Sequence, residues 1–315
     1  MKSHLFPVIL ESMEDRYLRY NHLNEYLKNK FGERTLKICI DGGFTCPNRD
    51  GKCGYMGCIF CGEKGSGEHL NKISINKQIT NYFESYRATR ANKFIVYFQN
   101  FTNTYSDRLE HLKEVYDSSL IDDRIVGIQI ATRPDCITEE IVKLISSYSN
   151  KYYVCVELGL QTANDETAKL INRGYNSSEY TKAVAILNKY NIDIVTHIMV
   201  GLPNETKTDI ENTVNFINKH NIQGIKIHST YIIKDTELYN MYLKDEYTPI
   251  SYEYYMECLE YTITHISPKL IIHRISGDPP KKQFIAPEWC LNKKSVLNGL
   301  DKLLREKNLS QGMFY

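Results

Sequence analysis

Four cysteines lie close together in one glycine-rich stretch of the chain, residues 41–70. They are Cys46, Cys53, Cys58 and Cys61. Thiolates are soft ligands that suit iron–sulfur clusters or zinc, and the Cys58-x-x-Cys61 turn lets two sulfurs reach one metal centre. The glycines and a proline of this stretch place the cysteines in a loop. The segment therefore predicts a soft-metal site.

Three kinds of site fit these cysteines. A structural zinc knuckle would use all four, but such knuckles usually pair two CxxC-like turns, and Cys46 and Cys53 are too far apart to form one. A cluster bound by three cysteines would leave one iron open, as catalysis requires and a structural site does not. A redox-active cysteine pair is the third alternative.

Short β-branched runs alternate with longer amphipathic segments. Nearly continuous Val and Ile predict strands that are buried on both faces of a parallel sheet. The expected strands are Leu36–Asp41, Phe94–Gln99, Ile125–Ala131, Tyr153–Leu158, Ile192–Val200, Gly224–Tyr231 and Leu270–Ile275. The expected helices are Ser106–Ser119, Thr138–Ser149, Glu166–Ile171, Ser177–Lys189 and Lys207–Lys219. This alternation predicts an α/β barrel or a doubly wound sheet, and a barrel gathers reactive residues at the carboxyl ends of its strands.

The cysteine loop resembles that of radical S-adenosylmethionine (SAM) enzymes, in the branch that includes the catalytic subunit of Elongator. More narrowly, it is similar to the bacterial YtqA/YhcC-type (MnmL-like) family, which is associated with tRNA wobble-uridine modification. The matching segments are residues 31–32, 41–51, 57–61 and 65–67. The resemblance implies that Cys46, Cys58 and Cys61 ligate a 4Fe–4S cluster whose open iron binds SAM. Cys53 falls outside the family's ligand pattern.

Later strand ends carry motifs that agree with this resemblance. Glu157 and Gln161 alternate onto one face of a strand, and Arg173 offers a planar fork that suits a carboxylate. The alternative is that Glu157 and Gln161 pair within the barrel. His197 either faces the active site or is a satisfied core histidine. By resemblance, the residues expected to contact SAM are Phe60, Gly65, Gly67, Glu157, Gln161, Arg173, His197 and Gly201.

Three further segments, residues 97–105, 131–136 and 272–289, also resemble the YtqA/YhcC-type family. Asp135 could instead cap the helix expected from Thr138. The C-terminal part of the chain is locally basic, which suits phosphate contacts with RNA, although a solvated charged surface is the alternative. The candidate substrate contacts are Gln99, Asn100, Asn103, Arg133, Asp135, His273, Arg274 and Trp289. No residue is assigned to catalysis.

The resemblance implies a partial (βα)6 TIM-like barrel of the radical SAM type with short terminal extensions. We expect a helical extension over 1–35, the barrel core over 36–232, and a C-terminal extension over 233–315 that completes the barrel mouth. The implied reaction is cleavage of SAM to a 5′-deoxyadenosyl radical, with an electron from a donor such as flavodoxin or ferredoxin. The implied substrate is the 5-substituent of the tRNA wobble uridine. A small metabolite or peptide is an alternative substrate, and a zinc-stabilised, non-catalytic RNA-binding protein is an alternative function.

The bulk composition sets wider limits. The 315 residues include 39 Lys and Arg against 38 Asp and Glu, which argues against a globally basic nucleic-acid binder but permits a local basic face. No apolar run approaches the roughly 20 residues of a membrane span, and acidic residues interrupt the short apolar start. Nine cysteines in this length are not a secreted disulfide framework. We therefore expect a cytoplasmic protein with no membrane partner.

Overall fold

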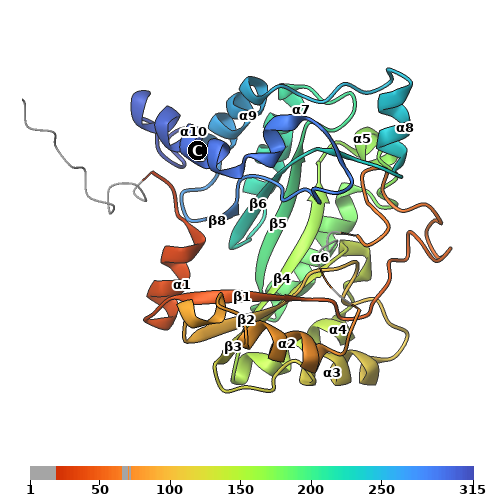
Figure 1. The fold of residues 1–315 in the computed structure, drawn as a ribbon, viewed down its shortest axis with the longest axis vertical. Coiled ribbons are helices and arrows are strands. Elements are labelled where there is room, and N and C mark those ends of the chain that lie inside the picture. Colours follow the sequence, from red (N-terminus) through yellow and green to blue (C-terminus); the bar gives the residue numbers. More distant parts are fainter. Residues whose placement is uncertain (1–18, 66–69, 71) are drawn as a thin grey trace, which may run out of the picture.

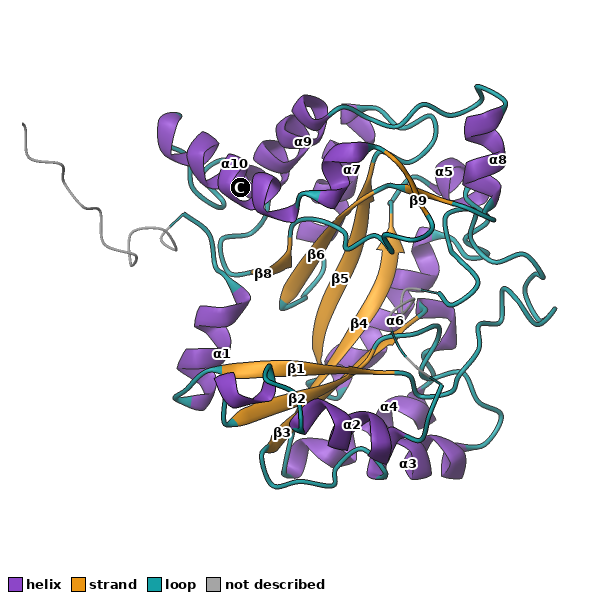
Figure 2. Ribbon diagram, in the orientation of Figure 1, coloured by secondary structure: helices purple, strands orange, loops and turns teal. Residues whose placement is uncertain are grey.

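The computed structural model describes residues 19–65, 70 and 72–315. Their centre is a seven-stranded sheet that curls into an open arc, with helices along its outer side (Figure 1). The strands follow one another in chain order and every neighbouring pair is parallel. Parallel neighbours need crossover connections, and helices supply them here (Figure 2). The arrangement is the expected partial α/β barrel.

All seven expected strands are present, and the last of them extends the sheet beyond the six-stranded core. They are β1 (Thr35–Ile40), β2 (Lys93–Phe98), β3 (Ile125–Thr132), β4 (Tyr153–Gln161), β5 (Asp193–Val200), β6 (Gly224–Ser229) and β8 (Ile271–Arg274). A second, two-stranded antiparallel sheet pairs β7 (Ile232–Ile233) with β9 (Phe284–Ala286). The C-terminal part of the chain thus contributes a strand to the barrel itself.

The five expected helices also form, within a few residues of their predicted bounds. The helices of the strand–helix series are α2 (Ile75–Phe83), α3 (Leu109–Asp117), α4 (Glu139–Ser147), α5 (Asp165–Leu170), α6 (Ser177–Lys189) and α7 (Lys207–Asn218). The others are α1 (Leu23–Phe31), α8 (Glu237–Leu243), α9 (Tyr252–His265) and α10 (Lys293–Glu306). No helix among the described residues is long and apolar enough to cross a membrane.

Side-chain caps fix where the loops end and the helices begin. The Thr138 hydroxyl accepts a hydrogen bond from the Ile141 amide at the start of α4, and Thr206 with Asp209 forms a capping box at α7. Asp135 does not cap α4; its carboxylate pairs with Arg133. These caps end the loops after β3 and β5 at defined residues.

The two faces of the sheet differ in character. The outer face packs apolar strand residues such as Phe94 and Ile128 against the helices in one continuous core. The inner face carries charged residues, including Lys37, Glu157 and Lys226. Charged groups on a buried sheet face need partners or ligands, so the inner face is the place to look for function.

The N-terminal segment closes part of the open side of the barrel. His22 bridges Ile272 of β8 in parallel, and the Ile272 amide donates to the carbonyl of Asn21 at 2.8 Å. Helix α1 contacts both β1 and β8, the two edge strands. Residues 21–31 therefore span the gap that a complete barrel would fill with further strands.

Candidate functional site

A cavity of about 1340 Å³ occupies the concave side of the sheet. Residues of all seven barrel strands and of the cysteine loop line it together. The three cysteines of the predicted set lie on its wall, and Cys53 does not. The partial barrel thus brings the metal-binding candidates and the charged inner face into one space.

The cysteine loop itself separates three cysteines from the fourth. Cys46, Cys58 and Cys61 are half-buried at the cavity, whereas Cys53 is exposed. The Cys61 amide donates to the Cys58 carbonyl at 2.9 Å, which forms the tight turn expected of the CxxC spacing. The Cys53 amide donates instead to the carbonyl of Pro47 at 2.7 Å. The geometry favours three ligands rather than four.

Two asparagines anchor the loop to the barrel. The buried Asn48 amide donates to the carbonyl of Asn172 at 2.6 Å, and the Asn172 amide donates to the carbonyl of Gly57 at 2.7 Å. Arg49 adds donors to the carbonyls of Cys61 and Gly62 at 2.8 and 2.7 Å. This reciprocal bonding holds the cysteines before any metal binds, which lowers the ordering cost of binding.

The surroundings of the sulfurs fit a 4Fe–4S cluster. A guanidinium nitrogen of Arg133 lies 3.9 Å from Cys46 Sγ, and the amide nitrogen of Asn48 lies 4.0 Å from Cys58 Sγ. Donors directed at the sulfurs and a nearby cation suit an anionic cluster. No three described His, Cys, Asp or Glu side chains converge on one point as a single ion requires. A cubane cluster binds each cysteine at a separate corner, so it does not require such convergence.

The thiols must lose their protons when metal binds. Burial raises the pKa of the Cys58 thiol to about 12, and the neighbouring Cys61 adds to the rise, while Arg133 and Arg173 oppose it. A thiol releases its proton when it binds a metal as the thiolate, and the two guanidinium groups favour the resulting negative charge. The two arginines would therefore assist metal binding at Cys58 without being candidate ligands themselves.

Arg133 and Arg173 are neighbours beside the cysteine loop. Arg133 lines the cavity, pairs with Asp135 at 2.7 Å, and donates to the carbonyl of Arg173 at 2.9 Å. Arg173 is fully buried and donates to the carbonyls of Leu160, Thr162 and Tyr175. It does not line the cavity. The contact of Arg173 with the SAM carboxylate stays a prediction, because in this structure its guanidinium anchors the end of β4.

Tyr175 connects the arginines to the predicted SAM site. Both guanidinium groups lie over its ring, with their centres 4.7 Å (Arg133) and 4.6 Å (Arg173) from the ring centroid. Its hydroxyl lies 2.6 Å from the carbonyl of Gly159 and 3.1 Å from Oε1 of Gln161. Gln161 lines the cavity after a register shift at the end of β4, where its φ is 58°. Tyr175 therefore orients Gln161 at the cavity wall.

The remaining predicted SAM contacts divide into two groups. Phe60 and Gly65 line the cavity beside the cysteines. Gly201 forms the turn after β5 with a φ of 90°, and its carbonyl accepts from the Tyr247 hydroxyl at 2.7 Å, but it does not line the cavity. Gly67 lies outside the described residues.

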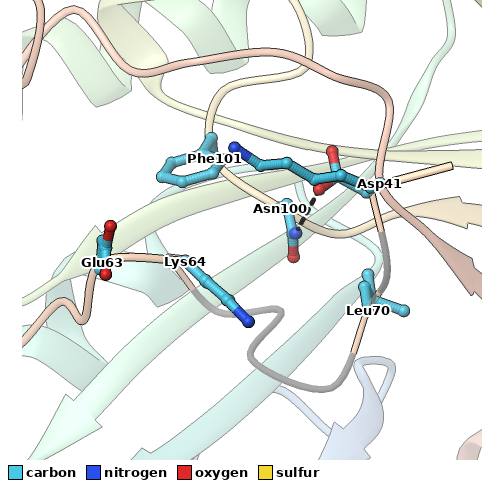
Figure 3. Close-up of a pocket in the computed structure, with 7 residues that line it drawn as sticks. Asp41, Glu63, Lys64, Leu70, Asn100 and Phe101 are labelled. Atoms are coloured by element: carbon cyan, nitrogen blue, oxygen red, sulfur yellow. Dashed lines mark hydrogen bonds between the residues drawn. The ribbon is translucent and has the colours of Figure 1, made fainter.

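The predicted substrate contacts also divide. Gln99, His273 and Arg274 line the cavity with Arg133. Asn100 instead lines a second pocket of about 330 Å³ with Glu63, Lys64 and Phe101, where its amide donates to Asp41 at 3.0 Å (Figure 3). It is adjacent to the main cavity rather than part of its wall.

Asn103 and Trp289 have structural surroundings that the sequence did not indicate. The Asn103 amide is buried and lies within hydrogen-bonding distance of the carbonyls of Phe98, Asn100 and Ala131. The Trp289 indole donates to the carbonyl of Ile250 at 3.0 Å and packs against the apolar core. Neither lines the cavity, so the structure gives no support to a substrate contact at either position.

Of the charged cluster on the inner face, Glu157 and His197 were predicted from the sequence as SAM contacts, and Lys37 and Lys226 were missed. Glu157 is fully buried; its Oε1 lies 3.4 Å from Lys37, and its Oε2 lies 2.5 Å from Lys226 and 2.7 Å from His197. Burial opposes ionisation of Glu157, but the two lysines outweigh it and hold the pKa of this carboxyl well below its usual range. Both oxygens are thus engaged with cations rather than free for SAM. Two otherwise apolar strands each contain a lysine, Lys37 in β1 and Lys226 in β6. Lysine is almost never fully buried unless it is paired, so these two positions could have indicated the cluster from the sequence.

The cavity wall as a whole is strongly cationic. Eleven Lys and Arg residues line it against two acidic residues, Glu157 and Asp278. The rest of the chain then holds 28 basic and 36 acidic residues. A chain with almost no net charge therefore concentrates its positive charge around one cavity.

Comparison with known proteins defines the class to which this fold and site belong. The Radical SAM superfamily model matches residues 48–217, and the Radical SAM C-terminal domain model matches residues 222–306. The chain belongs to the radical SAM superfamily. Its membership implies an enzyme with an iron–sulfur cluster and SAM as its cofactors.

Within the superfamily the chain is of the predicted YtqA/YhcC type. It is 37% identical to the uncharacterized protein YtqA of Bacillus subtilis, over 94% of this chain and 93% of that protein. A tRNA uridine(34) acetyltransferase of Dehalococcoides mccartyi is 30% identical over 45% of this chain and 30% of its own length. The solved structure of Methanocaldococcus infernus Elp3 superposes with a TM-score of 0.66 at 17% identity, covering 88% of this chain and 64% of that one. The last likeness supports the fold alone.

Proposed function

We propose that this chain is a radical SAM enzyme that modifies the 5-substituent of the tRNA wobble uridine. The observation that carries the RNA part of the proposal is the cationic cavity, with its eleven Lys and Arg residues against two acids. An RNA substrate carries one negative charge per nucleotide, so a basic rim around a reactive cavity supplies affinity and orientation. The relative named for tRNA uridine(34) gives independent support for the substrate class.

In this proposal Cys46, Cys58 and Cys61 hold the cluster, and SAM binds beside Phe60, Gly65 and Gln161. When bound there, the cluster and SAM would supply the radical chemistry that removes hydrogen from the substrate. The protein contributes position and exclusion of water, since cofactor chemistry of this kind must be protected from side reactions. An external donor such as flavodoxin or ferredoxin supplies the electron, and we expect the reaction to take place in the cytoplasm.

The rim of the cavity would hold the tRNA backbone. Lys281, Lys282 and Lys293 line one part of the cavity, and Arg34 and Arg87 line the side formed by the N-terminal half. Phosphate contacts position an RNA without reading its sequence. The base that enters would be selected deeper in the cavity, close to the cysteines.

We expect the double substitution Lys281→Glu/Lys282→Glu to weaken binding of bulk tRNA about tenfold at moderate salt, because two phosphate contacts are lost. The slope of the logarithm of the binding constant against the logarithm of the salt concentration should fall by about one unit per lost contact. Filter binding at several salt concentrations measures both. Lys302→Glu is the matched control, since Lys302 on α10 lies outside the cavity lining and pairs with Glu306. Equal weakening by the control would contradict a binding rim at residues 281–282.

We expect cells that lack the protein to show a changed set of modified wobble uridines, with the unprocessed 5-substituent accumulating. Mass spectrometry of tRNA nucleosides from cells with and without the gene measures this. A Cys58→Ala variant should fail to restore the profile, and the unmutated gene should restore it. An unchanged nucleoside profile would contradict the tRNA substrate. SAM cleavage that proceeds equally with and without tRNA would then favour a small metabolite or a peptide.

A further inference from the structure

The inner end of the cavity holds a group of ionisable side chains from five strands, which we call the lumen cluster. Its members are Lys37, Glu157, His197, Lys226, His228, His273 and Arg274. Every one of them lines the same cavity as Cys46, Cys58 and Cys61. The cluster is therefore on the path of any substrate group that passes the cofactor site and enters the barrel.

The lumen cluster contains more positive than negative charge. Glu157 is its single acid, and both of its oxygens are already paired with Lys37, Lys226 and His197. Arg274 pairs with Asp278 at 2.8 Å, but Asp278 also pairs with Lys293 at 3.0 Å. In the buried part of the cluster the two lysines, Lys37 and Lys226, thus share the one carboxylate of Glu157, whereas the side chains of Arg274, Asp278 and Lys293 are 30%, 49% and 43% exposed. Burying cationic groups without enough anions is unfavourable, so the cluster is suited to receive further negative charge.

One member of the cluster has an unused hydrogen-bonding position. Nε2 of His228 is buried and has no hydrogen-bond partner among the described residues. Its ring lies beside the ring of His197, with the two centroids 5.1 Å apart. Along β6, His228 lies two residues beyond Lys226. Burial lowers the pKa of Lys226 to about 7, although Glu157 opposes the shift. An additional anion would favour the charged form of Lys226 and give His228 a partner.

We propose that the lumen cluster is an anion subsite that binds a carboxylate on the substrate group entering the barrel, with Lys226 and His228 as its main contacts. This inference rests on the proposed function, because the entering group is the 5-substituent of the uridine. Backbone phosphates remain at Lys281 and Lys282, since they are joined to neighbouring nucleotides and cannot pass into the barrel. A carboxylate at the end of a flexible 5-substituent has no such restriction.

The test compares two nucleosides that differ at the carboxylate, which one of them carries free and the other capped by a methyl group. They are 5-carboxymethylaminomethyluridine and its methyl ester. Calorimetric titration of the cluster-loaded, SAM-bound protein should show about tenfold tighter binding of the acid, the difference expected from one charge-assisted hydrogen bond. Equal affinity for acid and ester would overturn the subsite. The free nucleoside is used so that the measurement does not depend on tRNA binding.

Two substitutions test the assigned residues. His228→Phe keeps the ring and removes the donor, and Lys226→Met removes the charge; each should reduce the acid-over-ester preference to about twofold or less. His220→Phe is the matched control, because His220 lies two residues beyond the end of α7 and outside the cavity lining. Lys226→Arg should keep most of the preference. A preference that survives both His228→Phe and Lys226→Met would overturn the assignment, and thermal melting of each variant reports its folding.

The proposed function and the subsite can fail separately. Tight acid binding with no change in tRNA nucleosides of the deleted strain would overturn the wobble-uridine substrate and leave the anion subsite standing. A changed nucleoside profile with equal affinity for acid and ester would overturn the subsite and leave the proposed function standing.

Discussion

Replacing Cys46, Cys58 or Cys61 with alanine is expected to abolish cluster binding, whereas Cys53→Ala should retain it. Each of the three lines the cavity, and in the proposed site each would supply one thiolate to one iron, so the loss of any one would leave that iron without its protein ligand. Cys53 is exposed and lies off the cavity wall. The measurement is iron and acid-labile sulfide per chain after anaerobic reconstitution. We expect at least about a tenfold loss of iron in the first three variants and none in the fourth.

Cys53→Ala is the internal control because it removes a thiol from the same loop. Equal loss of iron in Cys53→Ala would show a four-cysteine site and contradict the three-ligand assignment. A colourless protein that contains zinc and no iron after anaerobic purification would support the non-catalytic RNA-binding alternative. Thermal melting of the metal-free variants separates a lost ligand from a lost fold, since the barrel core does not include the loop cysteines.

The fold was predictable because strand and helix signals repeat with the chain order of the barrel. Runs such as Ile125–Thr132 are buried almost throughout, and a parallel strand buried on both faces must be nearly continuously apolar. The same logic located β8, although its short run gave no sign that it would pair with β6. The bridging of the edge strands by residues 21–31 was not predictable. It depends on contacts between the two ends of the chain, such as His22 with Ile272, which no local pattern encodes.

The candidate site was predictable where local spacing carries the chemistry and not where distant residues meet. The cysteine turn and Phe60 are local, and the structure places them together on the cavity. Sequence motifs assigned Arg173 to the SAM carboxylate and Arg133 to the substrate, and of these two arginines Arg133 lines the cavity whereas Arg173 does not. Sequence spacing does not specify on which side of a loop a guanidinium lies. Lys226 was missed because its partner Glu157 is 69 residues away.

The substitution Glu157→Gln is expected to lower the free energy of unfolding by about 3–5 kcal/mol. Glu157 is the buried anion that Lys37, Lys226 and His197 share, and removing one partner of a buried ion pair leaves the others as uncompensated charges. Lys226→Met should cost less, because Glu157 keeps Lys37 and His197 as partners. Urea unfolding at neutral pH measures both changes.

The pH dependence of stability has a definite sign for each partner. The pKa of Glu157 is lowered in the folded protein, so its contribution is present above the unfolded value of about 4.3 and is lost as the pH falls through the folded value. The pKa of Lys226 is lowered to about 7, so between about pH 7 and 10 the unfolded state binds more protons and stability rises with pH. Glu157→Gln should remove the loss of stability at acid pH, and Lys226→Met should remove the rise in stability between about pH 7 and 10.

The double variant Glu157→Gln/Lys226→Met decides whether the pair acts as a unit. Removing both charges leaves no unpaired partner between them, so the double variant should be more stable than the sum of the two single losses predicts. Strict additivity would show that Lys37 and His197 alone compensate Glu157. The same double variant bears on the anion subsite, because a cluster that has lost one charge of each sign keeps its net charge but loses its principal ligand contact. Its stability should then recover in part while its preference for the acid over the ester does not.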